Sequence, residues 1–298
     1  MSAPEGMTLL IVYSSGDLGD VGRHCVALAL KQPRIRQVKV VTDQPPQDLY
    51  DEQRYNKCRC PPHTHELLGF KDRLRVFPAN LSHEEFSRHV QNVDAVISCL
   101  GNRLPFHPDS SSHIAENATT RIVQALLDLD KTRQRIIMLS SVGIGNDWPP
   151  LEGLREGTFL QGLFRTICWE QYQDLSGAER AVIRSWSSNQ LDYVTVRCVL
   201  LPDECQPTGL FRAIDQPQGI ERQANTDTDV ERRRDPCGRA GPDYDQCIAK
   251  LDAALFLIQE VVRPSRHRQV VILGGRPTHT DSDVAHGDSE SGKAPLHL

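Results

Sequence analysis

The sequence has no apolar run long enough to cross a membrane. A bilayer-spanning helix needs about 20 consecutive apolar residues. The apolar segment Met7–Tyr13 is far shorter and lacks the flanking features of a signal peptide. We therefore expect a cytoplasmic protein with no membrane partner.

An excess of positive charge is also missing. Lys and Arg number 34 against 39 Asp and Glu, which gives a net charge of −5, and the pI is near 6.1. Proteins that bind nucleic acid gather phosphates with clustered Lys and Arg. The basic triplet at residues 232–234 lies in an acid-rich stretch, which favours a solvated loop. We expect no nucleic-acid partner.

Cysteine is present in an odd number, nine, and the residues are scattered along the chain, which predicts free thiols. Cys58, Cys60, His63 and His65 bring two thiols and two imidazoles into eight residues, and such soft ligands suit zinc or copper. However, structural zinc sites usually separate their ligand pairs by a longer stretch of chain. We therefore predict a solvated proline-rich loop here and no metal.

Short apolar runs alternate with amphipathic segments along most of the chain. The strands are predicted at residues 9–13, 38–41, 74–77, 93–100, 136–139, 193–201 and 270–273. The helices are predicted at residues 20–31, 83–90, 115–129, 160–185 and 246–262. Continuous apolar strands are buried on both faces, and parallel neighbours need crossover helices. This pattern predicts an α/β protein with a doubly wound parallel sheet, in which Cys99 and Cys198 are buried thiols.

Three segments interrupt this alternation: residues 44–72, residues 216–243 and the tail at residues 277–298. Residues 44–72 carry four prolines among polar residues and read as a long loop. Residues 216–243 are rich in charge, Gly and Pro, which predicts an insertion that is flexible or ordered by a partner. We predict a first domain over residues 1–202, a smaller carboxyl-terminal part over 203–276 and a disordered tail over 277–298.

A glycine-rich turn follows the first predicted strand. Gly16 allows a tight turn, Gly19 lets the backbone approach a pyrophosphate, and Gly22 lets the helix pack closely on the strand. The helix N-terminus offers amide groups and a partial positive charge to phosphates. Asp17 and Asp20 in the same turn would repel phosphate unless they point outward. The spacing favours a dinucleotide site over the alternative, an ordinary surface turn.

Asp43 stands at the end of the second predicted strand, about 20 residues past the glycines. An acidic residue at this position commonly binds the ribose hydroxyls of the adenosine. A carboxylate there disfavours a 2′-phosphate, so we expect NAD slightly over NADP. The alternative is an ordinary aspartate at the start of a loop.

Four segments occur in the order found in atypical short-chain dehydrogenase/reductases. They are residues 15–23, 93–101, 136–143 and 191–197. The chain most resembles the NmrA-like and flavin reductase/biliverdin reductase B-like branch, and the resemblance is good over residues 7–202. It implies a Rossmann fold with NAD or NADP lying across the carboxyl ends of the strands.

The resemblance also implies roles for individual residues. Gly16, Gly19 and Gly22 match the phosphate loop of the family, and Asn80 stands where relatives often have an Asp near the adenine. Gly101, followed by Asn102 and Arg103, matches the segment that passes the nicotinamide ribose. Ser141 matches the active-site serine at the end of the fifth strand.

One departure from the family pattern concerns the proton donor. Relatives with full dehydrogenase chemistry carry Tyr-x-x-x-Lys, in which the lysine lowers the pKa of the tyrosine. Here Tyr172 is the only good candidate and Ser176 stands four residues later; no lysine lies between Lys131 and Lys250. The flavin and biliverdin reductases of this branch pass hydride directly to an acceptor without that pair.

The resemblance, together with the missing lysine, therefore implies NAD(P)H-dependent reduction of a small planar or carbonyl acceptor, with Ser141 orienting cofactor or substrate and Tyr172 as the candidate proton donor. Two alternatives stay open. The chain could be a non-catalytic NAD(P)-binding sensor, regulatory or assembly protein with a protein partner, or its pocket could bind nothing.

Four aromatic residues could form an apolar wall for the acceptor or belong to the core: Trp148, Phe159, Phe164 and Trp169.

Overall fold

A computed structural model describes the chain in twelve stretches. They are residues 6–14, 17–44, 69–70, 72–79, 83–101, 113–129, 134–142, 169–185, 191–199, 201–202, 207–216 and 247–275. The strands are β1 (Met7–Tyr13), β2 (Ile35–Thr42), β3 (Leu74–Pro78), β4 (Ala95–Cys99), β5 (Gln134–Ser141), β6 (Leu191–Cys198), β7 (Phe211–Gln216) and β8 (Gln269–Gly275). The helices are α1 (Asp17–Lys31), α4 (His83–Val90), α5 (Ile114–Leu127), α7 (Trp169–Arg184) and α8 (Lys250–Val262).

The described strands form one sheet in the order β3-β2-β1-β4-β5-β6-β8-β7. Every neighbouring pair is parallel except β7 and β8, which are antiparallel. The strand order reverses between β1 and β4, and Tyr13 at the end of β1 pairs with Thr42 on one side and Cys99 on the other. The predicted doubly wound α/β fold is confirmed.

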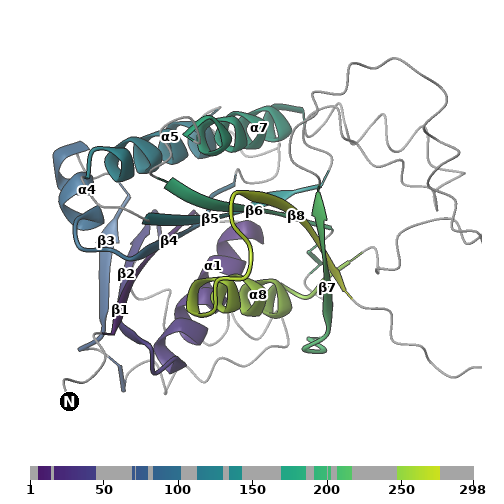
Figure 1. The fold of residues 1–298 in the computed structure, drawn as a ribbon, viewed down its shortest axis with the longest axis horizontal. Coiled ribbons are helices and arrows are strands. Elements are labelled where there is room, and N and C mark those ends of the chain that lie inside the picture. The colour runs from purple at the N-terminus through teal and green to yellow at the C-terminus, as the bar shows by residue number, and fades with distance from the viewer. Residues whose placement is uncertain are drawn as a thin grey trace, which may run out of the picture.

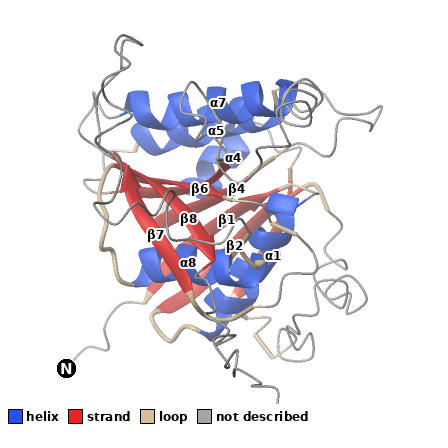
Figure 2. Ribbon diagram, turned by 90° about the vertical axis from the view of Figure 1, so that its right-hand side faces the viewer, coloured by secondary structure: helices blue, strands red, loops and turns tan. Residues whose placement is uncertain are grey.

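Helices cover both faces of the sheet (Figures 1 and 2). α1 and α8 lie on one face, and α4, α5 and α7 lie on the other. Two buried apolar clusters match these layers. The first contains Leu9, Ile11 and residues of α1 and α8, and the second contains Leu10, Val12 and residues of α4, α5 and α7. Successive residues of β1 therefore enter different cores, as the continuous apolar run predicted.

Most predicted elements lie where expected, but four boundaries are wrong by three or more residues and one strand was missed. β2 begins at Ile35 rather than at residue 38. α1 begins at Asp17 rather than at residue 20, β6 ends at Cys198 rather than at 201, and α8 begins at Lys250 rather than at 246. β7 was missed, and its last residue, Gln216, was assigned to the insertion. β7 was not predicted because it is an edge strand. Its exposed residues Arg212 and Asp215 interrupt the apolar run by which a strand is found.

The cysteines in strands are buried, as predicted. Cys99 and Cys198 have at most 1% of their surface exposed, and both face α1 and α8 in the first cluster together with Cys25. Burial raises the pKa of both strand thiols, and for Cys99 a hydrogen bond with Cys25 adds to the effect. Such thiols stay protonated at neutral pH and are poor nucleophiles.

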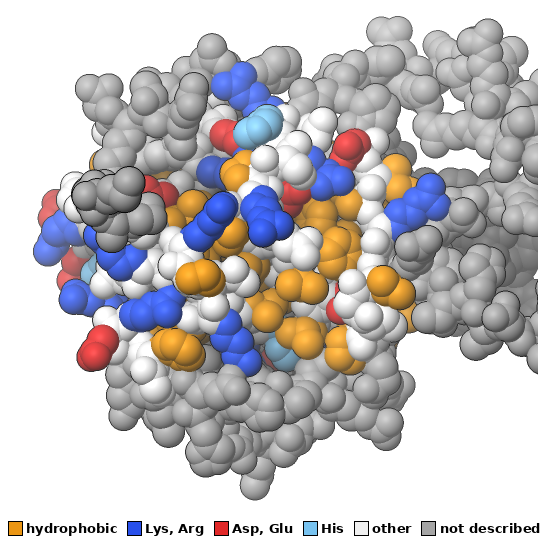
Figure 3. Space-filling view, turned by 60° about the horizontal axis from the view of Figure 1, so that its bottom comes forward, with side chains coloured by type: hydrophobic (Ala, Val, Ile, Leu, Met, Phe, Trp, Pro, Cys, Tyr) orange, Lys and Arg blue, Asp and Glu red, His pale blue; other side chains and the backbone are white. Residues whose placement is uncertain are grey.

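Basic residues stabilise the helix ends on the α1 and α8 side of the molecule. Lys31 lies in the last turn of α1, and Arg34 donates from Nη1 to the carbonyl of Val262 at the end of α8 (3.3 Å). Cations at these positions interact favourably with the negative end of a helix dipole. Lys and Arg side chains are spread among hydrophobic ones over the described part of this face (Figure 3), and these contacts give some of them a structural role.

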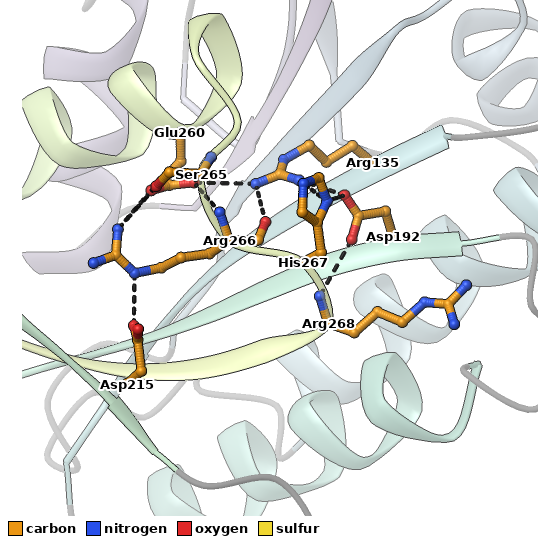
Figure 4. Close-up of polar contacts among 8 residues, drawn as sticks. All are labelled: Arg135, Asp192, Asp215, Glu260, Ser265, Arg266, His267 and Arg268. Atoms are coloured by element: carbon orange, nitrogen blue, oxygen red, sulfur yellow. Dashed lines mark hydrogen bonds and ion pairs between the residues drawn. The ribbon is translucent and has the colours of Figure 1, made fainter.

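A network of ion pairs and hydrogen bonds joins β5, β6, β7 and α8 at the edge of the sheet where the parallel strands begin (Figure 4). We call it the amino-edge cluster, and it consists of Arg135, Asp192, Asp215, Glu260, Ser265, Arg266, His267 and Arg268. Arg135 bonds to Asp192 and also to Glu260 (3.1 Å), and Arg266 bridges Glu260 and Asp215 (2.7 Å each). Burial alone would raise the pKa of Glu260, but hydrogen bonds from Ser265 and Arg266 outweigh it and lower that pKa.

A second buried ion pair joins β6 to α7. Arg197 donates from Nε and Nη2 to the two carboxylate oxygens of Glu179 (3.0 and 2.7 Å), and both residues are less than 10% exposed. This bidentate geometry is the strongest arrangement of an arginine and a carboxylate. It fixes α7 over the carboxyl half of β6.

None of the described helices is long and apolar enough to span a membrane.

Candidate functional site

The strand order reverses between β1 and β4, and ligands of such sheets bind outside the carboxyl ends of the strands at this point. Here the ends of the two strands are joined by Ser14. Its Oγ donates to the carbonyl of Gly101 (2.7 Å) and accepts from the Gly101 amide (3.2 Å). Both residues are buried. The predicted cofactor residue Gly101 therefore lies at the switch point, while Asn102 and Arg103 lie outside the described residues.

Gly101 also lets α1 approach β4. A Cβ on Gly101 would lie 2.6 Å from Cδ1 of Leu18, in the first turn of the helix. The structure thus brings the end of β4 and the start of α1 into direct contact. Ser14 was not predicted, because its only signal in the sequence is a small polar residue at the end of an apolar strand.

Gly19 and Gly22 lie inside α1 and hold it against β1. A Cβ on Gly19 would lie 1.6 Å from the carbonyl oxygen of Ser14, and one on Gly22 would lie 2.5 Å from Cβ of Tyr13. Close packing of helix on strand was expected for Gly22 and is observed. Gly19 also has this packing role, because α1 begins at Asp17 and encloses it. Gly16 lies outside the described residues, and the contribution of the three glycines to cofactor binding stays a prediction.

The acidic residue Asp20 is neutralised within the protein. Its carboxylate accepts from Arg23 on the same helix and from the ammonium of Lys250 on α8 (3.0 Å). Lys250 is only 2% exposed. Asp20 therefore links α1 to α8, and its charge is compensated by two cations. The side chain of Asp17 lies outside the described residues.

These features fit a dinucleotide. The start of α1 supplies the amide groups and the partial positive charge that phosphates prefer. Gly19 and Gly22 have no side chains and so let the first turns of α1 pack closely on β1. Arg23 and Lys250 balance the charge of Asp20. The residues that the fold places at the switch point therefore suit a phosphate-containing cofactor.

His24 lies beside this ion pair, and its pKa predicts acid sensitivity. The pKa of His24 is lowered from 6.5 to about 4, mainly by burial; Asp20 opposes this shift, and the charges of Arg23 and Lys250 add to it. Below pH 6.5 the His24 imidazole is protonated in the unfolded chain but stays neutral in the folded protein. The free energy of unfolding therefore falls as the pH drops from 6.5 to about 4. The loss reaches about 3 kcal/mol at 1.36 kcal/mol per pH unit.

This loss can be isolated by measuring urea unfolding between pH 7 and 4 for the wild type and for His24→Gln. Carboxylates titrate in both proteins, so the difference between the two curves reports the histidine. We expect the wild type to lose stability more steeply than the variant over this range. Parallel curves would show that His24 is not the residue responsible.

Asp43 is exposed and follows β2 directly, at the same edge of the sheet as Ser14 and Gly101. This is where a residue that binds the adenosine ribose must lie. The neighbouring turn is fixed, because the amide of Gln44 donates to Oγ1 of Thr42 (3.1 Å). Asn80, predicted near the adenine, lies outside the described residues, and the ribose role of Asp43 stays a prediction.

The two predicted catalytic residues lie on neighbouring elements. Ser141 is the last residue of β5, is partly buried and donates from Oγ to the carbonyl of Val142 (3.2 Å). Tyr172 lies in the first turn of α7, partly buried against the second apolar cluster. α7 follows β5 and packs on it. The described contacts of Ser141 do not include Tyr172, so the roles of both residues stay predictions.

The remaining predicted features lie outside the described residues. The Cys58, Cys60, His63 and His65 segment is among them, as are Trp148, Phe159 and Phe164 and the side chain of Trp169. In the twelve described stretches, no group of three or more His, Cys, Asp and Glu side chains could hold a metal ion.

The fold and the site define a Rossmann-type protein with a candidate dinucleotide site at the switch point of the sheet. Comparison with protein families makes this specific. The profile of the NAD(P)H-binding family matches residues 59–232, which is more than half of the chain. The chain therefore belongs to the NAD(P)H-binding family. No curated protein sequence matches it.

Solved structures share the fold at low sequence identity. The anaerobillin reductase ChuY from Escherichia coli O157:H7 is 17% identical, with a TM-score of 0.54, over 91% of this chain and all of that one. A Bacillus halodurans protein described as an NAD-dependent epimerase/dehydratase is 18% identical, with a TM-score of 0.52, over 92% and 96% of the two chains. A Streptococcus pneumoniae TIGR4 protein described as an NADH-flavin reductase is 14% identical, with a TM-score of 0.50, over 91% and 100%. At these identities the likeness establishes the fold alone.

Proposed function

We propose that this protein is an NAD(P)H-dependent oxidoreductase that reduces a small planar or carbonyl acceptor by direct hydride transfer. Membership of the NAD(P)H-binding family is the observation that carries the proposal. It is supported by the switch point at Ser14 and Gly101 and by the close approach of α1. When bound, the reduced nicotinamide supplies the hydride.

The missing lysine favours direct transfer. Ser176 stands where the usual pair would place its lysine, and the chain has no lysine between Lys131 and Lys250. A tyrosine without that cation keeps a high pKa and is a weak base for alcohol oxidation. Hydride transfer to an acceptor stacked on the nicotinamide depends mainly on positioning. Ser141 would orient the cofactor or the acceptor, and Tyr172 would donate the proton.

Two coupled measurements test the proposal. Titration of the purified protein with NADH and NADPH is followed by energy transfer from its three tryptophans and by calorimetry. We expect micromolar binding, and then turnover of NADH or NADPH with flavin or quinone acceptors. Absence of binding up to millimolar cofactor would refute the proposal.

A second candidate is a non-catalytic NAD(P)-binding sensor or a regulatory or assembly protein. The absent lysine favours it as well, because a binding protein has no need of a proton relay. It predicts micromolar cofactor binding without turnover of any flavin or quinone acceptor. The same two measurements therefore separate it from the reductase.

Cofactor preference depends on Asp43 in this proposal. Its carboxylate would bind the ribose hydroxyls and repel a 2′-phosphate, so NAD is slightly preferred. Replacing Asp43 by Arg should shift the NADPH-to-NADH affinity ratio about tenfold or more toward NADPH, since arginine accommodates the phosphate. The ratio is measured by calorimetry, with Asp72→Arg, another exposed aspartate, as the control. An unchanged ratio in Asp43→Arg would remove this role.

A further inference from the structure

A buried carboxylate on α7 caps a different helix. Asp174 has no exposed surface, and its two carboxylate oxygens accept the backbone amides of Ala115 (2.9 Å) and Glu116 (2.7 Å) in the first turn of α5. α5 has no cap of its own, because His113 before it is in a left-handed conformation and makes no capping bond from its side chain. Asp174 therefore supplies from α7 the acceptors that the start of α5 needs.

Close packing reinforces this contact one turn further along α7. A Cβ on Gly177 would lie 2.2 Å from the carboxyl carbon of Glu116. The Glu116 carboxylate also bonds to Nδ1 of His113 (3.1 Å). Glycine inside a helix costs about 1 kcal/mol relative to alanine, and here it admits the side chain of the neighbouring helix. Asp174 and Gly177 together fix the start of α5 against the middle of α7.

Both helices belong to one half of the sheet. β4, β5 and β6 lie on one side of the switch point, and β1, β2 and β3 lie on the other. Each half of such a fold binds one mononucleotide of the cofactor. α5 follows β4, and α7 follows β5 and carries Tyr172 two residues before Asp174. The described hydrogen bonds of Asp174 reach α5 and do not extend to α1 or β2.

From this arrangement we infer that Asp174 is a positioning residue for the nicotinamide half of the cofactor. It acts by holding α5 and α7 in fixed relation, so that the end of β4 and the tyrosine of α7 face the same bound ring. The adenosine half would bind at β1, β2 and α1 and would not depend on Asp174. This inference rests on the proposed function.

The test compares a whole cofactor with its adenosine fragment. NADH and ADP-ribose are titrated by calorimetry into the full-length wild type and Asp174→Asn. The amide keeps the size of the side chain but turns one acceptor into a donor that faces a backbone amide. We expect NADH affinity to fall about tenfold while ADP-ribose affinity changes by less than twofold.

Asp252→Asn is the matched control. Asp252 is also buried, and its carboxylate also accepts two backbone amides, those of Thr208 (2.9 Å) and Gly209 (3.0 Å), but it lies on α8. This variant should lose comparable thermal stability and keep the wild-type ratio of NADH to ADP-ribose affinity. If Asp174→Asn does not fold, Gly177→Leu separates the same two helices and takes its place.

The outcomes are distinct. Selective loss of NADH affinity in Asp174→Asn, with the ratio unchanged in Asp252→Asn, supports the inference. Equal losses for both ligands, or no loss of NADH affinity, overturn it and leave the proposed function intact. A wild type that binds neither ligand refutes the proposed function, and the inference fails with it.

Discussion

Replacing Glu179 by leucine should lower the free energy of unfolding by about 3–5 kcal/mol, because it leaves the guanidinium of Arg197 buried without its carboxylate. Both side chains are almost fully enclosed between β6 and α7, and two hydrogen bonds join them. Only about a tenth of the arginine side chain is exposed, so water replaces the lost partner poorly. The loss is measured by urea unfolding at pH 7.

A double variant separates the charge effect from a packing effect. In Glu179→Leu with Arg197→Met neither charge remains, and apolar replacement of a whole buried pair is often close to neutral. We expect the double variant to recover most of the lost stability. Arg180→Ala, at an exposed position on the same helix, should change stability by less than about 0.5 kcal/mol. A loss of less than 1 kcal/mol in Glu179→Leu would show that the pair contributes little.

Replacing Gly19 by alanine should weaken NADH binding at least 100-fold, equivalent to about 2.7 kcal/mol. The added Cβ would lie 1.6 Å from the Ser14 carbonyl oxygen and 2.8 Å from its carbon. These are backbone atoms at the end of a central strand, so the first turn of α1 must move instead. That movement displaces the amide groups on which the cofactor phosphates depend. Calorimetric titration with NADH measures the loss.

Gly209→Ala controls for the general cost of replacing a glycine. Gly209 has a φ of +69°, and a Cβ there would meet nothing within 4 Å. This variant should lose stability through backbone strain, by about 1 kcal/mol, yet bind NADH as the wild type does. Circular dichroism establishes that Gly19→Ala is folded at the temperature of the titration. Wild-type NADH affinity in Gly19→Ala would place the phosphates away from the start of α1.

The central sheet could be predicted because its strands are apolar on both faces. Residues 9–13 alternate between two cores, and a continuous apolar run reports that directly. β7 could not be found in this way, because it is an edge strand in which Arg212 and Asp215 are exposed. The early start of α1 was missed because glycines usually mark turns, whereas Gly19 and Gly22 here serve helix packing.

Residues of the candidate site were predictable where they belong to a local motif. Gly19, Gly22 and Asp43 were proposed as cofactor-binding residues from their distance to a strand, and Gly101 from the resemblance. Ser14 and Asp174 act through partners 87 and about 58 positions away. Such contacts leave no pattern in one sequence, because each depends on which strands and helices the fold places together.

The position of β8 has a consequence for how the chain is made. β8 lies between β6 and β7, and in the described sheet β8 is the only strand that pairs with β7. On the ribosome, β7 therefore emerges without a neighbour, and β6 keeps an open edge until Gln269 and the residues after it have been translated. Unpaired strand edges of this kind are prone to aggregation. The nascent protein should depend on chaperones most during this interval, and a stop codon before β8 should yield an insoluble product.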